Sequence, residues 1–306
     1  MNSTNPSTVP NSDAPAAETA TPEAHGQLMP HAPAKGDLYD DSVLNFEQLG
    51  LRSSVLKGVK EAGFERPTKI QAMLIPPIMA GKDMLGQAKT GSGKTAAFAL
   101  PLLHALDKDA QFQALVLVPT RELCVQVARE INELGKHTPI KAAAVYGGER
   151  INQQVETIKR GAHIVVSTPG RLMDMMERGY VHLRAIKHVV LDEEDRMLDI
   201  GFREDIRRIL KQCPSERQTV FVSATLPEEV ERLARGYSKN PERVIAIAKG
   251  AMTTAAVRQF YLAVQPWDRR RLLLHLFTHE EPALTVVFCR TKRTVDELAE
   301  FLVRHK

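Results

Sequence analysis

Residues 83–95 read DMLGQAKTGSGKT, a short apolar run that leads into a glycine-rich turn and a lysine. The apolar run Asp83–Gly86 indicates a buried strand, and the turn opens a stretch of helical character. Glycines allow the backbone to curl so that its N–H groups point inward, beside the positive end of a helix dipole. This strand, loop and helix therefore predict a phosphate-binding loop.

The loop Ala88–Thr95 supplies groups suited to a nucleotide triphosphate. In such a loop Lys94 reaches the β- and γ-phosphates, and Thr95 ligates Mg²⁺. The general pattern has glycine at the position of Ala88, so the match to it is imperfect. The predicted phosphate-binding residues are Thr90, Gly91, Ser92, Gly93, Lys94 and Thr95.

A phosphate-binding loop also needs an acid that holds the metal at the end of a neighbouring strand. The segment His188–Glu193 supplies it, because Asp192 and Glu193 follow an apolar run. Asp192 is expected to hold Mg²⁺ through water, and Glu193 to orient or deprotonate the attacking water. Alone, the segment could be a solvated acidic turn; together with the loop it indicates a catalytic set of Lys94, Asp192 and Glu193.

Short apolar runs alternate with amphipathic stretches of helical period, such as Arg121–Leu134 and Glu228–Tyr237. This alternation predicts an α/β fold, with a parallel sheet covered by helices on both faces. The apolar runs are Asp83–Gly86, Ala114–Val118, Ala142–Tyr146, His163–Val166, His188–Leu191, Thr219–Val222 and Val244–Ile247.

The two ends of the chain differ in composition from its centre. Residues 1–41 are rich in Pro, Ala, Ser and Thr, so we expect a disordered tail before an ATP-binding domain at 42–249. Gly250–Thr254 resembles a linker, and residues 250–306 resemble the start of a second α/β domain. Its expected elements are a strand, a helix, a strand and a helix, at Val257–Val264, Asp268–His279, Leu284–Cys289 and Thr291–His305.

The composition is that of an ordinary globular protein, with 306 residues, 43% hydrophobic and 25% charged. The net charge of +4 fits a polyanionic partner without demonstrating one. The three cysteines lie far apart without metal-binding spacing, which indicates reduced thiols. Neither a run long enough to cross a bilayer nor a secretory signal is evident, so we expect a cytoplasmic protein, and a monomer by default.

The segment Leu191–Phe202 resembles the DEAD-box segment of ATP-dependent RNA helicases. Stretches similar to the other motifs of that family occur in the family's order, before and after this segment, from about Asn45 to the last residue. The resemblance implies a RecA-like domain followed by an incomplete second one, with ATP and Mg²⁺ as cofactors. The similar motifs are Phe46 with Gly63–Gln71 (Q motif), Ala88–Thr95 (I), Pro119–Leu123 (Ia), Gly147-Gly148 (GG), Thr168–Arg171 (Ib), Ser223–Thr225 (III) and Val287–Lys292 (IV).

The resemblance implies that Gln71 reads adenine, which suits an amide that both donates and accepts, and that Phe46 stacks on the base. Phe46 could instead be a core residue. Ser223 and Thr225 are expected to hydrogen-bond near Asp195 and to couple nucleotide state to domain closure. A cap at the strand end is the alternative for these two side chains.

RNA is the implied partner, bound through hydroxyls, backbone N–H groups and arginines that suit phosphates and sugars. None of these groups reads bases, so binding is expected to ignore sequence and to distinguish RNA from DNA by the 2′-hydroxyl. Thr168 and Arg171 could instead cap a helix. The implied RNA-binding residues are Pro119, Thr120, Arg121, Gly147, Gly148, Thr168, Gly170, Arg171 and Thr291.

Two features depart from the family. Glu194 replaces the alanine of the DEAD tetrapeptide, where neighbouring like charges should raise one another's pKa; we expect it to point away from the metal and to be tolerated. The motifs V and VI are absent, and an arginine such as motif VI supplies is worth about 10³–10⁵ in rate. The chain is therefore expected to bind ATP, to hydrolyse it poorly, and to expose Val286, Phe288, Leu298 and Phe301 on an unfinished face.

Three functions remain open on this basis. The first is an RNA-stimulated ATPase that separates short duplexes, which the intact pair Asp192 and Glu193 favours. The second is an ATP-dependent RNA clamp with slow hydrolysis, which the missing arginine motif favours. The third is a DNA-directed helicase, against which the similarity to the Q motif argues.

Overall fold

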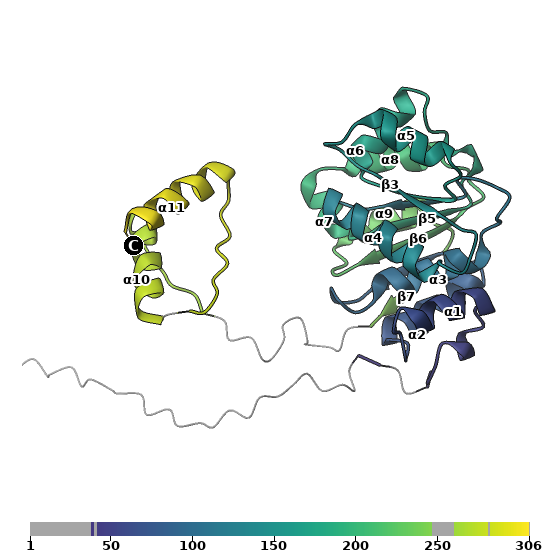
Figure 1. The fold of residues 1–306 in the computed structure, drawn as a ribbon, viewed down its shortest axis with the longest axis horizontal. Helices are drawn as coiled ribbons and strands as arrows, with labels where there is room; N and C mark the ends of the chain where they lie inside the picture. The colour runs from purple at the N-terminus through teal and green to yellow at the C-terminus, as the bar shows by residue number, and fades with distance from the viewer. Residues whose placement is uncertain (1–37, 40–41, 247–259, 281, 306) are drawn as a thin grey trace, which may run out of the picture. The chain divides into compact units, whose positions relative to one another are not determined.

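The computed structural model describes residues 38–39, 42–246, 260–280 and 282–305 (Figure 1). The chain forms two compact units, residues 1–256 and 257–306, which are described separately below. The expected linker Gly250–Thr254 and the expected boundary between residues 249 and 250 lie outside the described residues, as does most of the expected N-terminal tail.

The first unit is built on a seven-stranded sheet with the order β3-β4-β2-β5-β6-β1-β7, in which every pair of neighbours is parallel. Its central strands are buried along their whole length, as parallel strands covered on both faces require. The α/β prediction is therefore confirmed. The strands are β1 (Met84–Gln87), β2 (Ala114–Leu117), β3 (Ala142–Val145), β4 (Ile164–Ser167), β5 (His188–Asp192), β6 (Gln218–Ser223) and β7 (Glu242–Ile245).

Helices cover both faces of this sheet, each over its own apolar core (Figure 1). One face carries α1 (Ser53–Glu61), α2 (Lys69–Met79), α3 (Lys94–Ala105) and α4 (Arg121–Leu134). The other carries α5 (Ile151–Lys159), α6 (Pro169–Glu177), α7 (Glu194–Ile200), α8 (Arg203–Gln212) and α9 (Glu228–Tyr237). Short 3-10 turns, η2 (Glu47–Leu49) and η3 (Leu183–Ala185), complete the unit.

The predicted elements of the first unit are found at or near their expected bounds. The helices α4 and α9 begin and end where their amphipathic periods predict. The strands differ from the apolar runs by a residue or two; β7, for example, begins at Glu242 rather than Val244. Parallel strands place their carboxyl ends at one edge of the sheet, where ligands of such folds bind.

The expectation that the N-terminal tail extends to Asp41 is wrong at two positions. Leu38 accepts a 2.7 Å hydrogen bond from the N–H of Lys69, at the start of α2, and Tyr39 forms an isolated antiparallel bridge with Thr68. The guanidinium of Arg66 also lies 5.4 Å from the centre of the Tyr39 ring. These contacts order the segment because the first N–H groups of a helix lack partners within it.

The second unit contains η4 (Pro266–Asp268), α10 (Arg269–Glu280) and α11 (Lys292–Arg304), so both predicted helices are confirmed. The predicted strands are wrong for the residues that the structure describes, because 260–264 and 284–289 have no strand conformation. A strand needs neighbours for its backbone groups, and two isolated strands do not make a stable parallel sheet.

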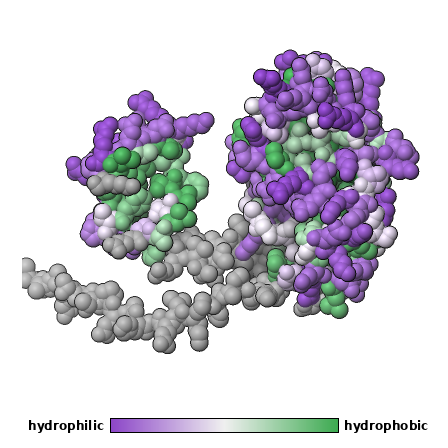
Figure 2. Space-filling view, viewed as in Figure 1, coloured by the Kyte–Doolittle hydropathy of each residue, from purple (hydrophilic) through white to green (hydrophobic). Residues whose placement is uncertain are grey.

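Apolar side chains gather on one side of the second unit, coloured green in Figure 2. Val286 and Phe288 are 68% and 92% exposed, as expected. Leu298 and Phe301 are partly buried instead, because the helices α10 and α11 pack against each other. The expectation of exposure is thus confirmed for the extended segment and wrong for the helix.

The cysteines of the described residues are free thiols. Burial raises the pKa of Cys124 to about 12 and that of Cys213 to about 11, so neither is a reactive thiolate at neutral pH. Within the described ranges, no helix combines the length and apolar character needed to cross a bilayer.

Candidate nucleotide and RNA site

The phosphate-binding loop joins the end of β1 to the start of α3 at the carboxyl edge of the sheet. Gly91 and Gly93 have φ of 76° and 84°, a left-handed conformation that suits glycine. Ala88 stands where the general pattern has glycine, yet it is fully buried in the apolar core and its N–H donates to Ser223. The alanine is therefore accommodated as a packing residue at the foot of the loop.

Lys94 currently closes the loop on itself. Its amino group donates to the carbonyl oxygens of Ala88 at 2.9 Å and of Lys89 at 3.1 Å. Burial lowers the pKa of Lys94, while the nearby carboxylates of Asp192 and Glu193 oppose that shift. A cation held inside a loop of this shape is available to exchange its two carbonyl partners for phosphate oxygens.

The acidic segment lies across from this lysine. Burial raises the pKa of Asp192 to about 7, with Lys94 acting in the opposite direction. Glu193 has φ of 53°, which is rare for a residue with a side chain, and its carboxylate lies 3.4 Å from the Arg196 guanidinium. Strain of this kind is typical of functional positions, and here it turns the chain from β5 directly into α7.

The glutamine of the Q motif connects α2 to the phosphate-binding loop. Gln71 accepts a hydrogen bond from the N–H of Thr68 at 2.9 Å and donates to the Gly93 carbonyl at 3.1 Å. The Thr68 hydroxyl donates to the Ser92 carbonyl at 2.8 Å. Both polar ends of the Gln71 amide are engaged within the protein, so the structure shows it bracing the loop; its role in reading adenine stays a prediction.

Phe46 lies in the apolar core, only 3% exposed, with its ring edge against Phe64 at 6.2 Å between centroids. The core position that was the alternative for Phe46 is therefore the one that this structure shows. Stacking on a base needs a more exposed ring than this conformation offers, so that role also stays a prediction.

The hydrogen bonds expected of motif III are present. The Thr225 hydroxyl donates to Asp195 at 2.6 Å, its N–H donates to the same oxygen at 3.0 Å, and the Ser223 hydroxyl lies 3.5 Å from the Asp195 nitrogen. Although burial opposes it, these hydrogen bonds hold the pKa of Asp195 below its usual value. The contact ties β6 to α7; the coupling to domain closure stays a prediction.

The residues expected to bind RNA within the first unit gather at the same edge of the sheet. Thr120 caps α4, accepting from the N–H of Leu123 at 3.3 Å, and Thr168 precedes Pro169 at the start of α6. Gly147, Gly148 and Gly170 are exposed, so their backbone groups are accessible. Pro119 is buried and is not presented for contact. Thr291 caps α11 in the second unit, which is described separately.

The two arginines of this edge are already engaged. Arg121 lies over the Tyr146 ring at 5.0 Å, and a Cβ at Gly148 would approach its guanidinium to 3.2 Å. Arg171 donates twice to the Glu149 carbonyl, at 3.1 and 3.2 Å. The arginines therefore hold the glycine loop in place. The capping alternative for Thr168 and Arg171 is not seen, because the Thr168 side chain makes no cap hydrogen bond at α6 and Arg171 contacts the loop instead.

The chain matches the DEAD/DEAH box helicase family model over residues 68–233, more than half of its length. The chain belongs to this family. It is 45% identical, over 258 residues, to the DEAD-box ATP-dependent RNA helicase CshA of Bacillus cereus, and 43% identical, over 267 residues, to RhpA of Helicobacter pylori.

These alignments cover 84% and 87% of this chain but 49% and 54% of the two relatives, so the chain spans about half the length of the helicases that it matches. A crystal structure of a DEAD box protein from Methanococcus jannaschii is similar at a TM-score of 0.65 and 38% identity. That match covers 85% of this chain and 70% of the other, and it supports the RecA-like fold.

The residues of this candidate site suit a magnesium ion that arrives with a nucleotide. The Oδ1 atom of Asp192 is buried and has no hydrogen-bond partner among the described residues, so it can accept a water of a hydrated cation. No cluster of three or more His, Cys, Asp or Glu side chains in the described ranges could hold a metal alone. Thr95 and Asp192 would therefore share Mg²⁺ with phosphate oxygens, and the ion would supply positive charge to them.

Glu194 is the residue whose environment the sequence predicts least well. Its side chain is fully buried, and both carboxylate oxygens lack a hydrogen-bond partner within the described structure. Burial raises its pKa well above the usual value, and the charge of Asp195 adds to that shift. A neighbouring like charge thus raises this pKa as expected, although the charge that acts is that of Asp195 and burial is the larger cause. The direction of the side chain relative to a metal stays a prediction.

Two residues of the candidate site were not among the predicted ones. Glu130 of α4 hydrogen-bonds Thr95, and burial raises the pKa of Glu130. Gln154 exchanges hydrogen bonds with Tyr146 at 3.0 and 3.2 Å and so supports the glycine loop. Glu130 lies three residues after Val127 and four before Leu134, on the buried side of α4, which is the signal that could have identified it.

Proposed function

We propose that this protein is an ATP-dependent RNA helicase that binds ATP with Mg²⁺ and RNA, and couples ATP hydrolysis to local duplex unwinding or remodelling of RNA–protein complexes. The supporting observation is the arrangement at the end of β1, where Lys94 sits in the phosphate-binding loop facing the buried carboxyl of Asp192. A lysine and a metal-holding acid in this relation are what phosphoryl transfer requires.

Within this proposal Lys94 binds the phosphates, Thr95 and Asp192 hold Mg²⁺, and Glu193 orients or deprotonates the attacking water. The Glu193 carboxylate is partly exposed, so water can reach it. Asp195 and Thr225 are the contact through which the site is expected to sense the adjoining domain. The names of the relatives, which are ATP-dependent RNA helicases, support RNA as the substrate.

We further propose that a polypeptide of these 306 residues binds ATP but hydrolyses it slowly. The arginines expected of motif VI, which stabilise charge on the γ-phosphate, are not among the motifs in this sequence. A group of that kind contributes about 10³–10⁵ in rate.

The test is steady-state ATP hydrolysis without nucleic acid, with single-stranded RNA, and with single-stranded DNA of the same sequence. The variant Lys94→Ala provides the background rate. Bound MgATP with turnover near the background rate would support the slow-hydrolysis proposal. Turnover stimulated by RNA would support the helicase and overturn slow hydrolysis, and equal stimulation by DNA would contradict RNA as the substrate. Failure to bind MgATP would contradict the proposed function.

An ATP-dependent RNA clamp with slow hydrolysis is the second candidate, and it would use the same MgATP site around Lys94 and Asp192. It predicts that a non-hydrolysable ATP analogue slows RNA dissociation while duplexes stay intact. We also propose that the protein is located in the cytoplasm and is a monomer. The free thiols of the described residues suit a reducing compartment. Gel filtration with light scattering measures the oligomeric state.

A further inference from the structure

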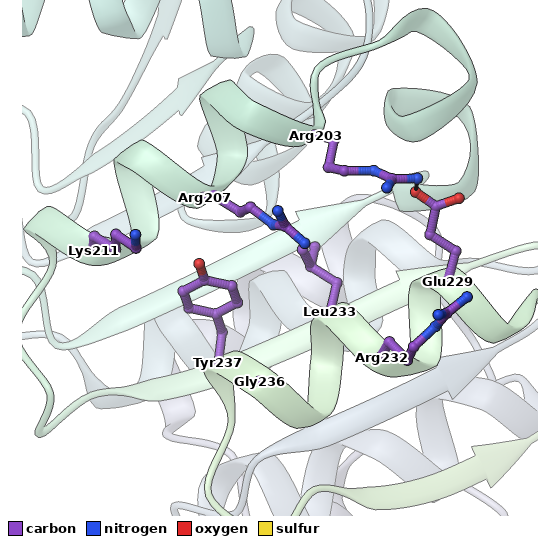
Figure 3. Close-up of a pocket in the computed structure, with 8 residues that line it drawn as sticks. All are labelled: Arg203, Arg207, Lys211, Glu229, Arg232, Leu233, Gly236 and Tyr237. Atoms are coloured by element: carbon purple, nitrogen blue, oxygen red, sulfur yellow. Dashed lines mark ion pairs between the residues drawn. The ribbon is translucent and has the colours of Figure 1, made fainter.

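A groove of about 560 Å³ lies between α8 and α9, away from the nucleotide site (Figure 3). Its walls are mostly basic, with an aromatic ring on one side. Figure 3 shows the Tyr237 hydroxyl directed towards α8, where Arg207 and Lys211 lie. The lining side chains that matter here are Arg203, Arg207, Lys211, Arg232, Leu233 and Tyr237.

One end of the groove is neutralised. Glu229 of α9 forms an ion pair with Arg203 of α8, which Figure 3 marks with a dashed line. At the other end, Lys211 has no acidic partner among the residues that the structure describes. The charge that remains for a ligand therefore concentrates away from Glu229.

Two further cations of the groove form only exposed ion pairs. Arg207 pairs with Glu204 at 3.0 Å, within its own helix, and Arg232 approaches Glu228 to 3.9 Å. The side chains of both pairs are 46% exposed or more, so water screens them and an anionic ligand can replace the carboxylates. Together with Lys211, these arginines offer positive charge from both walls.

We propose that this groove binds the phosphate backbone of single-stranded RNA that extends beyond the candidate RNA-binding edge, a proposal that rests on the proposed function above. The helix α6, whose N-terminus carries Thr168 and Arg171, packs against α8 on the same face of the sheet (Figure 1). Because α8 and α9 both begin near the carboxyl ends of the strands, the groove starts near that edge and leads away from it, with Lys211 towards its far end. Cations that follow a backbone, with an aromatic ring beside them, are the combination found at single-strand sites.

An acidic peptide is less well matched to the groove. The partly exposed ring of Tyr237 offers a surface for a base, which a run of carboxylates would leave unused. Gly236 keeps the α9 wall low, since a Cβ there would meet no atom within 4 Å. The groove therefore has room for a nucleotide as well as charge for its phosphate.

The test measures the salt dependence of affinity for single-stranded RNAs of increasing length, comparing Arg207→Gln/Lys211→Gln with the control Arg208→Gln/Arg235→Gln. The groove variant changes two lining residues of α8, and the control removes the same charge at exposed positions of α8 and α9 that do not line the groove. Each lost phosphate contact lowers the slope of log affinity against log salt by about 0.7. With long RNAs, we expect the slope for the groove variant to be lower by about 1.4 than that for the unaltered protein. With the shortest RNA that binds, we expect the slopes of both variants to match that of the unaltered protein.

A second variant, Gly236→Met, fills the groove without changing charge and should weaken long RNAs selectively. Slopes that match between groove variant and control, with normal RNA binding by the unaltered protein, would overturn the groove proposal and leave the proposed function intact. A groove variant that loses affinity for poly-glutamate but not for RNA would also overturn it, in favour of an acidic protein partner. An unaltered protein that binds no RNA would overturn both proposals.

Discussion

Replacing Glu194 with methionine should stabilise the protein, increasingly so as the pH rises. Methionine has a similar size and no charge, whereas the native carboxyl is fully buried without a hydrogen-bond partner in the described structure. An unpartnered buried polar group costs about 1–3 kcal/mol. Glu194→Met should therefore increase the free energy of unfolding even where the carboxyl is protonated in both states.

The pH dependence follows from the raised pKa of Glu194 in the folded protein. Above the usual pKa of a glutamate, 4.5, the unfolded carboxyl ionises while the folded one keeps its proton, so folding must take up a proton. The native protein then loses about 1.4 kcal/mol per pH unit relative to the variant, until the folded carboxyl ionises as well. The loss is absent below pH 4.5, where both states are protonated.

The assay is urea denaturation without metal at pH 5, 6 and 7, followed by circular dichroism because the single tryptophan, Trp267, lies in the second unit. Glu194→Gln is the matched control, since it keeps the polar shape and removes the titration. In both variants the free energy of unfolding, relative to that of the native protein, should rise with pH over this range. A constant difference across these pH values would refute the burial argument.

Three further predictions concern the same site. Because the pKa of Asp192 is raised to about 7, a proton competes with Mg²⁺ below that pH, and MgATP affinity should rise about tenfold from pH 6 to pH 8; titration calorimetry checks this, and an equal rise for ATP without Mg²⁺ would contradict it. Thr225→Val removes the 2.6 Å hydrogen bond to the Asp195 carboxylate and should cost about 1–2 kcal/mol of unfolding free energy at neutral pH. That loss should shrink as the pH falls through the lowered pKa of Asp195, and Thr225→Ser should retain the stability. Glu194→Ala should change ATP turnover by less than about a hundredfold, roughly 2.7 kcal/mol of barrier, and a larger rise would mean that this carboxyl obstructs the reaction.

The sequence predicts most of the fold of the first unit because its signals there are local. Runs such as Leu115-Val116-Leu117 favour a strand that is buried on both sides, and the spacing of apolar residues in Arg121–Leu134 fits one face of a helix. The loop residues around Lys94 are positioned by the two elements that flank them. These features need no knowledge of distant contacts.

The features that the sequence does not predict depend on distant partners. Arg171 contacts the carbonyl of Glu149, 22 residues away, and this choice is set by how α6 lies beside the glycine loop. Glu194 is buried because the left-handed conformation of Glu193 turns the next residue into the first turn of α7. The segment Leu284–Cys289 has the composition of a strand but lacks neighbours to pair with.

The central claim is that the loop around Lys94, together with Asp192, forms a site for MgATP. Equilibrium binding of MgATP tests it most directly, with Lys94→Ala as the variant and Lys89→Ala as the control, because Lys89 is an exposed lysine of the same loop. The account predicts binding that depends on Mg²⁺, is lost in Lys94→Ala and persists in Lys89→Ala. Equal binding by the protein and Lys94→Ala would contradict it.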